Sequence, residues 1–305
     1  ITFFKYCFLT FFSWNTFTTW WIWNASPGGA CLAIIANSLL MCIPFLLFQK
    51  TRKTLGTVPG FLSLLLYWLA FEYLHLNWDL DWPWLTLGNG LASRPEWIQW
   101  YDHTGHLGGS LWILTVNILF FLVIFKYLIP FYSLQKDAKN YRLKTLMASA
   151  NSLFAILLLI ISPITISKNI FNTYNEKENP VEVVVVQPNI DPYSEKFEGM
   201  TEDEQLRKLI SLSEKKITPQ TDYVIWPETA LPDGIWKNNI YTSLAYRKFK
   251  MFLLKYPEVN LITGFSFYEY LEDESATTEF SRKFSNGKGW YNTYNSAMQI
   301  DNEGK

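Results

Sequence analysis

The sequence predicts two parts of different class: a polytopic α-helical membrane region, followed by a layered α/β domain that ends before it is complete. Apolar runs of membrane length fill residues 1–168, and short alternating strand and helix patterns fill residues 181–305. A polar linker, residues 169–180, separates them. Acidic residues outnumber basic ones only after residue 168, so the net charge of −1 averages two unlike regions.

Five segments of the first part are long enough to cross about 30 Å of hydrocarbon as helices. They are residues 3–23, 28–48, 58–76, 107–131 and 143–166. Basic residues gather in the loops after the second and the fourth segment, so these loops are expected on the cytoplasmic side. An odd number of spans then places everything after Ile166 outside.

Tryptophans cluster at or near the predicted outer interface, where an apolar indole ring keeps its N–H within reach of a polar partner. They are Trp20, Trp21, Trp23, Trp78, Trp82, Trp84, Trp97 and Trp100. An aromatic belt accounts for most of them. The outer loop, residues 77–106, is longer than a simple connector. A second hypothesis is that this loop guides an acyl chain, with Trp82 and Trp84 as substrate contacts.

Glu72 lies inside the third predicted span, where a carboxyl is costly and indicates function. It is about one helical turn from the outer end, so a structural hydrogen bond to a neighbouring span is an equal alternative. His103 and His106 have no third ligand nearby, and no metal site or cofactor is predicted. The cysteines lie in apolar segments, where small buried side chains are expected: Cys7, Cys31 and Cys42.

The second part alternates strands and helices. Strands are predicted at residues 181–187, 222–226, 259–267 and 291–300, and helices at residues 201–216 and 239–255. Thr201 and Glu204 form a capping box at the start of the first helix. Two strands in succession at the end predict a sheet that is not wholly parallel, with helices packed on it.

The segment Val224–Glu228 is the strongest candidate for a functional site. An apolar strand stops at Pro227, which has no N–H for the sheet ladder, and a carboxyl follows at once. In open α/β folds, ligands bind at the carboxyl ends of strands. Glu228 is therefore the candidate catalytic residue, against the alternative of an ordinary surface acid.

Several short motifs follow one another along the chain. They are Val186-Gln187-Pro188-Asn189-Ile190, Ile225-Trp226-Pro227-Glu228-Thr229-Ala230-Leu231-Pro232, Thr263-Gly264, Tyr294-Asn295-Ser296, and the outer-loop motif Trp82-Pro83-Trp84-Leu85 with Gly88. With these motifs in this order, the sequence resembles the apolipoprotein N-acyltransferases over nearly its whole length. This family is a membrane branch of the carbon–nitrogen hydrolase (nitrilase) superfamily.

The resemblance implies an α-β-β-α sandwich on the periplasmic side of a bacterial inner membrane. It also implies eight spans, of which these five are the third to the seventh, so the chain is expected to be an internal fragment. The activity implied is transfer of a fatty acyl chain from a phospholipid to the N-terminal amine of a diacylglyceryl-cysteine lipoprotein. No nucleic-acid partner is expected.

The family uses a Glu–Lys–Cys triad and a thioester acyl-enzyme, and Glu228 matches its glutamate, the general base. The lysine and the cysteine are expected beyond Lys305, so the fragment itself is expected to be inactive. Lys196-Phe197 stands where the family often has Lys-Trp. Phe197 and Trp226 are the predicted substrate contacts of this domain.

Two rival functions share part of the pattern. A membrane-tethered amidase or nitrilase acting on a soluble C–N bond would also use Glu228, and only dependence on lipid separates it. A transporter with an outer accessory domain would line several spans with polar residues and with Gly/Pro breaks. Only Glu72 and Pro44 stand out in this way.

Overall fold

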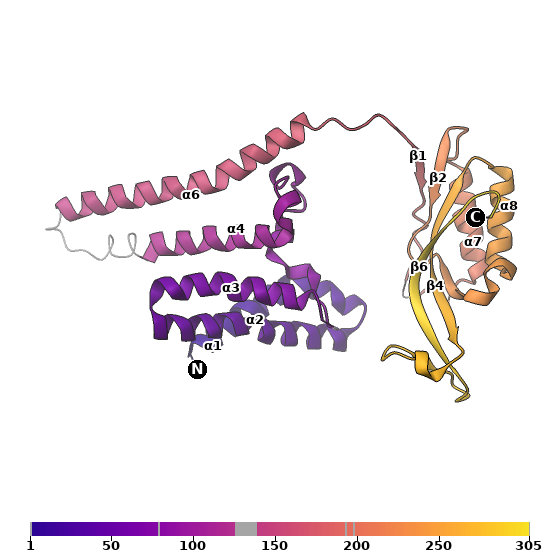
Figure 1. Ribbon diagram of the computed structural model, residues 1–305, viewed down its shortest axis with the longest axis horizontal. Coiled ribbons are helices and arrows are strands. Elements are labelled where there is room, and N and C mark those ends of the chain that lie inside the picture. The colour runs from indigo at the N-terminus through magenta and orange to yellow at the C-terminus, as the bar shows by residue number, and fades with distance from the viewer. Residues whose placement is uncertain (1, 79, 126–138, 193, 198, 305) are drawn as a thin grey trace. The chain divides into compact units, whose positions relative to one another are not determined.

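The computed structural model describes residues 2–78, 80–125, 139–192, 194–197 and 199–304, with side chains in residues 139–146 left out. The chain divides into two compact units, Ile1–Glu176 and Lys177–Lys305 (Figure 1). The first unit is helical, and the second is a mixed sheet with helices. This arrangement confirms the predicted fold class, a helical membrane region followed by an α/β domain.

The first unit contains the helices α1 (Thr2–Thr19), α2 (Pro27–Leu55), α3 (Thr57–His75), α4 (Tyr101–Val123) and α6 (Lys139–Thr173). Within the described residues, four stretches are long and apolar enough to cross a membrane: Pro27–Leu55, Thr57–His75, Tyr101–Val123 and Met147–Thr173. Helix α1 carries the first predicted span but is not one of these four, so that span stays a prediction. Residues 126–131 of the predicted span 107–131 lie outside the described residues.

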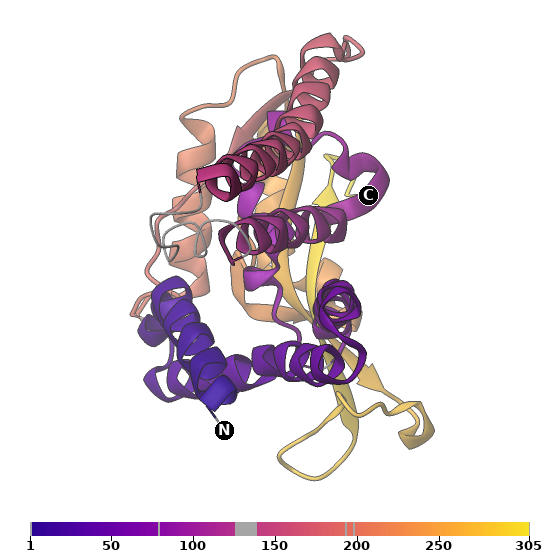
Figure 2. The same cartoon turned by 90° about the vertical axis from the view of Figure 1, so that its left-hand side faces the viewer.

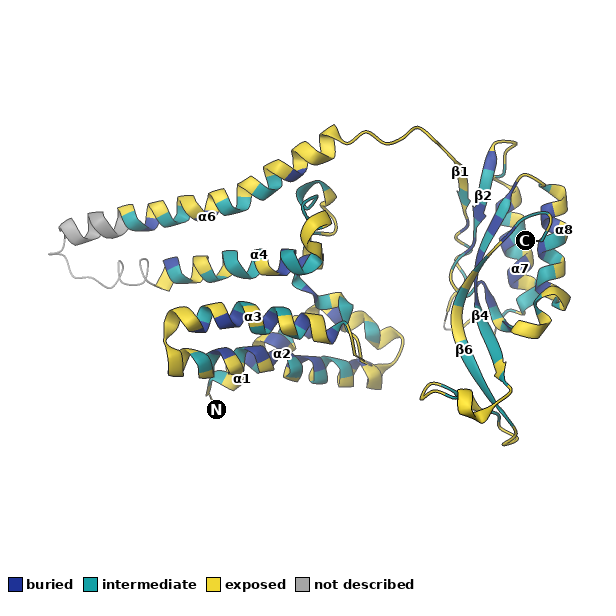
Figure 3. Cartoon of the chain, in the orientation of Figure 1, coloured by how far each residue is buried: buried dark blue, intermediate teal, exposed yellow. Residues whose placement is uncertain are grey.

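Local sequence sets the ends of the α2–α3 pair. The Ser26 hydroxyl caps α2 by accepting a hydrogen bond from the Gly29 amide, and Pro27 takes the first helical position. The helix ends at Gly56, whose φ of 95° suits glycine. A Cβ on Gly60 would come within 2.7 Å of Arg52 Cβ, so α3 can pack this closely against α2 only with glycine there. Many outward side chains of these helices are apolar and exposed, as a lipid-facing surface requires (Figure 3).

The second unit is a six-stranded sheet: β1 (Glu182–Val185), β2 (Thr221–Ile225), β3 (Leu231–Trp236), β4 (Asn260–Leu271), β5 (Arg282–Lys283) and β6 (Trp290–Ile300). The strand order is β1-β2-β4-β6-β5, and β3 pairs with β4 beside β2. Strands β2 and β3 run parallel to β4, while β6 is antiparallel to it over eleven residue pairs (Figure 2). The sheet is therefore mixed, as predicted.

Helices α7 (Glu202–Glu214) and α8 (Leu244–Lys255) lie on the same side of the sheet (Figure 1). Their apolar faces bury a core that includes Leu206, Leu209, Val224, Phe249, Leu253 and Leu261. The predicted capping box is present, because the Thr201 hydroxyl accepts from the Glu204 amide while Glu204 accepts from the Thr201 amide. The predicted helix 239–255 is shorter, since Ser243 caps a separate helix. The described residues also contain short 3-10 turns: η1 (Trp20–Asn24), η2 (Pro83–Leu85), η3 (Leu87–Leu91), η4 (Pro95–Trp97), η6 (Lys237–Thr242) and η7 (Glu274–Ala276).

Candidate functional site

Glu228 lies on a bulge between two strands that share one edge of β4. Pairing of β2 ends where Ile225 lies opposite Ile262, and pairing of β3 begins where Leu231 lies opposite Phe265. The β2–β3 chain thus advances six residues (231 − 225) while β4 advances three (265 − 262). Three residues are extra, and they bend out of the sheet. The strand does stop before Glu228, as predicted, but the chain returns to the same edge directly afterwards.

Both ends of the bulge are hydrogen-bonded to β4. The amide of Trp226 donates to the carbonyl oxygen of Ile262 at 2.8 Å, and the amide of Ala230 donates to that of Gly264 at 2.8 Å. These bonds continue the ladder up to each side of the extra residues. The Glu228 backbone is therefore attached to the sheet on both sides.

Gly264 allows the bulge to lie against β4. A Cβ at this position would lie 2.8 Å from Glu228 Cα and 3.0 Å from the Pro227 carbonyl oxygen and the Thr229 nitrogen. Thr229 itself has a φ of 51°, a left-handed conformation that a β-branched residue rarely adopts. Such a residue costs on the order of 1–3 kcal/mol and persists only where its surroundings hold it, most often at functional sites.

Two side chains reach Glu228 from other segments. Asn295 lies on β6 opposite Ser266, and its Nδ2 donates to Glu228 Oε1 at 2.6 Å. Lys196 Nζ donates to the main-chain carbonyl oxygen of Glu228 at 3.4 Å and lies 5.6 Å from the ring centre of Phe197. The structure thus brings an exposed carboxyl, an orienting amide and a cation together. It also places the predicted contact Phe197, which is 63% exposed, next to that cation.

A buried glutamine of α7 holds the loop that carries Lys196 through hydrogen bonds to the loop backbone. Gln205 is 2% exposed, and its Nε2 donates to the carbonyl oxygens of Lys196 at 2.7 Å and of Met200 at 3.1 Å. Gly199 allows the loop to turn back on itself, since a Cβ at this position would lie only 2.4 Å from the Ser194 carbonyl oxygen. The capped N-terminal turn of α7 therefore sets the position of the cation near the bulge.

Trp226 has a different place from the predicted one. Its side chain is 3% exposed, its Nε1 donates to Ser213 Oγ at 2.9 Å, and its ring centre is 5.6 Å from that of Phe249. The ring points into the core between the sheet and the helices, so no face of it is open to a substrate. Trp226 supports one end of the bulge from inside, and this packing role replaces the predicted substrate contact.

Trp82 and Trp84 belong to the first unit and lie at η2. Trp84 is 56% exposed, and its ring centre lies 5.0 Å from that of Trp82 and 5.8 Å from that of Trp21. The three indoles form one aromatic group, with Trp82 and Trp84 on the outer loop and Trp21 on η1. Their contact with a substrate stays a prediction.

A second carboxyl lies farther along β4. Lys237 at 2.5 Å and the Tyr294 hydroxyl at 3.1 Å hold the pKa of Glu269 below its ordinary value. This carboxyl is paired, whereas Glu228 bonds to a neutral amide. In the described part of the chain, no group of three or more His, Cys, Asp or Glu side chains could hold a metal.

The sequence singled out Glu228 as the candidate but gave no role to Asn295, Gly264 or Lys196. All three lie in motifs or next to residues that the resemblance singled out. Their role depends on the pairing of β4 with both the bulge and β6, which joins residues 67 positions apart. The available signal was a glycine on β4 and an asparagine on β6, which lie two positions apart in the pairing of the two strands, since Gly264 pairs with Ala297 and Asn295 with Ser266.

Comparison with known proteins agrees with the motifs. Residues 2–119 match the family model of the apolipoprotein N-acyltransferase N-terminal domain. An apolipoprotein N-acyltransferase from Chlorobaculum tepidum is 31% identical over 216 residues, which are 70% of this chain and 37% of the relative. The chain thus spans little more than a third of the length of the curated relative that it matches. The chain is thus similar to the apolipoprotein N-acyltransferases over most of its length, and the similarity of residues 2–119 is to the N-terminal domain of that family.

Proposed function

We propose that the protein containing this chain transfers a fatty acyl chain from a phospholipid to the N-terminal amine of a diacylglyceryl-cysteine lipoprotein. The reaction takes place at the outer face of a bacterial inner membrane, through a thioester, with Glu228 as the general base. The observation that carries this proposal is the Glu228 bulge, closed against Gly264 and oriented by Asn295. The similarity to an apolipoprotein N-acyltransferase supplies the reaction class.

In the first half of the proposed reaction, Glu228 takes the proton of a cysteine thiol that we expect beyond Lys305. A thiol is only a few per cent ionised at neutral pH, so a neighbouring base is required. The thiolate attacks the ester carbonyl of the phospholipid, a C–S bond forms, and the C–O bond to the glycerol oxygen breaks. The leaving oxygen takes its proton from the Glu228 carboxyl, and a lysophospholipid departs.

In the second half, the α-amine of the lipoprotein attacks the thioester. Glu228 takes a proton from this amine as the C–N bond forms and the C–S bond breaks, and the thiolate recovers a proton from Glu228. Asn295 holds Glu228 Oε1 in both halves, which keeps the acid in one orientation. Lys196 bonds to the main chain of Glu228, and it adds positive charge next to the site. We expect the lysine of the triad beyond Lys305.

Both proposed substrates carry acyl chains, and withdrawing a chain from the bilayer costs about 0.8 kcal/mol per CH₂. A membrane region in the same polypeptide removes most of that cost, because the acyl chains of the two substrates need not leave the lipid. The four membrane-length helices are consistent with this requirement.

The test is Glu228→Gln in the complete gene product, which preserves the shape and an acceptor for Asn295 but removes the base. We expect acyl transfer from phosphatidylethanolamine to a diacylated lipopeptide to fall by at least about 10²-fold, with membrane insertion unchanged. Glu269→Gln is the matched control, a second carboxyl on the same sheet. A wild-type rate in Glu228→Gln would refute the proposal, and hydrolysis of soluble amides without lipid would favour the amidase alternative.

A further inference from the structure

Helix α6 contains a proline inside its membrane-length segment, at Pro163. Because proline has no N–H, this residue cannot donate to the carbonyl oxygen of Leu159, four residues earlier. A carbonyl oxygen without a donor is costly in lipid, where no water replaces the missing bond. The sequence of α6 therefore creates an acceptor at Leu159 that the backbone of α6 does not satisfy.

A tryptophan of α4 supplies the missing donor. Trp112 Nε1 donates to the Leu159 carbonyl oxygen at 2.9 Å. The Trp112 ring is held edge to face by Trp100, with 5.8 Å between the ring centres. Trp100 in turn lies against Gly108, where a Cβ would come 3.3 Å from Trp100 Cζ3. The donor therefore comes from a side chain whose orientation is set by its neighbours near the start of α4.

Hydroxyl side chains on both sides of Pro163 also bond to the backbone of α6. Ser162 Oγ donates to the Leu158 carbonyl oxygen at 2.7 Å. Thr165 Oγ1 donates to the Ile161 carbonyl oxygen at 2.8 Å. Hydroxyls that bond to the carbonyl four residues earlier often bend a helix, and proline is the commonest cause of a kink. The sequence thus makes Pro163 the point at which α6 bends most easily.

Few side chains hold α6 in place by packing. Within residues 147–173, the buried side chains are Ser149, Ile156 and Ser167. A cavity of about 300 Å³ lies between α4 and α6, and its wall includes Trp112, Leu159 and Pro163. Over the described residues 150–173, the bond from Trp112 is the one hydrogen bond that joins α6 to another helix. The attachment of α6 at this level therefore depends on the indole.

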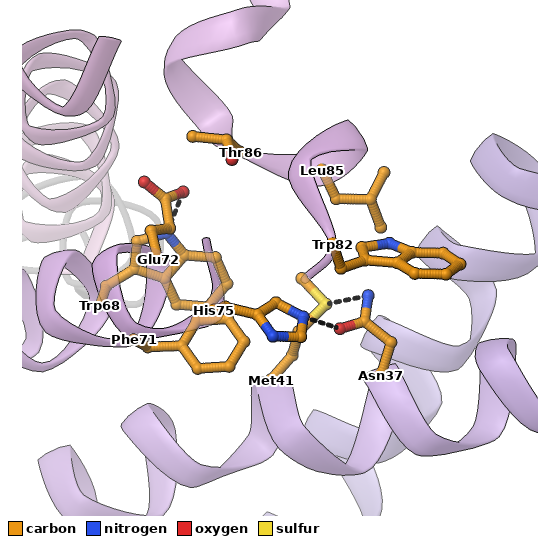
Figure 4. Close-up of a pocket in the computed structure, with 9 residues that line it drawn as sticks. All are labelled: Asn37, Met41, Trp68, Phe71, Glu72, His75, Trp82, Leu85 and Thr86. Atoms are coloured by element: carbon orange, nitrogen blue, oxygen red, sulfur yellow. Dashed lines mark hydrogen bonds between the residues drawn. The ribbon is translucent and has the colours of Figure 1, made fainter. Parts of the chain in front are cut away.

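The other helices of the first unit are joined in a different way. His75 Nε2 of α3 and Asn37 Oδ1 of α2 are 2.9 Å apart (Figure 4), and Asn37 Nδ2 donates to Asn15 Oδ1 of α1 at 2.7 Å. These bonds join side chains and need no break in a helix. Helix α2 also contains a proline, Pro44, but no side chain of the described residues donates to the carbonyl oxygen four residues before it. A proline alone therefore does not bring a donor from a neighbouring helix.

We propose that Pro163 is a hinge in α6 and that the Trp112 indole is the latch that closes it. With the hydrogen bond to Leu159 in place, α4 fixes the direction in which α6 continues to Thr173. Without that bond, residues 164–173 swing about Pro163. Helix α6 is the last helix of the first unit, so the latch sets the direction in which the chain leaves this unit. This role does not depend on the proposed acyl transfer.

Distances between spin labels test the hinge, with the chain in phospholipid nanodiscs and its native cysteines changed to alanine. One pair, at the exposed residues His103 and Ile170, joins α4 to the part of α6 after Pro163. A second pair, at Leu119 and Phe154, joins α4 to the part before it. Trp112→Phe removes the donor and keeps an aromatic ring.

In Trp112→Phe we expect the first pair to show an open population at least about threefold larger than in the parent, because an interhelical hydrogen bond is lost. The second pair should keep its distance. An equal change in both pairs would show that α6 moves as a whole and would overturn the hinge. Unchanged distances in both pairs would show that the indole holds nothing and would overturn the latch.

The proline provides the rescue experiment. Pro163→Ala restores an amide that can donate to the Leu159 carbonyl, so adding Trp112→Phe in that background should change the open population by less than about twofold. Pro44→Ala is the matched control, and it should leave the effect of Trp112→Phe unchanged. An effect of Trp112→Phe that is equally large in the Pro163→Ala background would show that the indole acts through packing, against the proposed latch.

Discussion

Substitution of Gly264 by alanine tests whether contact with β4 sets the position of Glu228, the proposed base. The added Cβ would lie 2.8 Å from Glu228 Cα, whereas carbon atoms in contact prefer about 3.5–4.0 Å. The bulge must therefore move away by roughly 0.7–1.2 Å (3.5 − 2.8 to 4.0 − 2.8). Misplacement of a catalytic group by about 1 Å can cost about 10²-fold in rate. Overpacking typically costs about 1–3 kcal/mol of stability.

We expect Gly264→Ala in the complete protein to lower kcat for acyl transfer by about 10–10² fold while the protein still folds. The assay follows lipopeptide acylation in proteoliposomes, together with thermal unfolding. Gly90→Ala is the control, because no atom lies within 4 Å of the Cβ position there. An unchanged kcat in Gly264→Ala would show that the bulge accommodates the methyl group, and that Gly264 does not determine where Glu228 stands.

Three further predictions concern side chains around the bulge and the adjoining helix. Asn295→Ala should lower kcat more than it raises KM, because Glu228 loses its orienting partner, and Asn295→Gln should not restore the rate; a wild-type kcat would contradict the orienting role. Trp226→Phe should lower the unfolding free energy by about 1–3 kcal/mol, since Ser213 loses a buried donor, and a wild-type melting temperature would contradict this. Burial raises the pKa of Glu202, and a neighbouring aspartate adds to the effect. The folded state therefore holds this proton more tightly than the unfolded state, so stability falls as pH rises from the ordinary value near 4.5 through the raised pKa. Glu202→Gln should flatten that dependence in melting curves at pH 4–7, and an unaltered slope would contradict the assignment.

The sequence predicted those features that depend on local chemistry. The apolar pattern located α3 within one residue at each end, since Gly56 precedes it and a polar loop follows. The predicted end of the preceding span, residue 48, was seven residues short of Leu55. Hydropathy marks only the edge of the hydrocarbon layer. Helix α2 continues beyond that edge through basic residues, because its backbone hydrogen bonds form in water as well as in lipid.

Strand β3 was not predicted, because Pro232 and Gly234 give its segment the pattern of a turn. Its identity as a strand comes from β4, a partner far away in the chain. The same reason limited the prediction of the site. Pro227 marked the end of β2 and so located Glu228, but the pairing register that brings Asn295 to it cannot be read from a single segment.

The double attachment of the Glu228 bulge has a kinetic consequence for the proposed reaction. The backbone on both sides of Glu228 is hydrogen-bonded to β4, and Asn295 holds its carboxyl, so the proposed base meets both substrates in one place. The thiol of the enzyme and the α-amine of the lipoprotein must then transfer their protons to Glu228 at the same place, one after the other. The lysophospholipid has to leave before the lipoprotein can enter, so initial rates measured against both substrates should give parallel lines in a double-reciprocal plot.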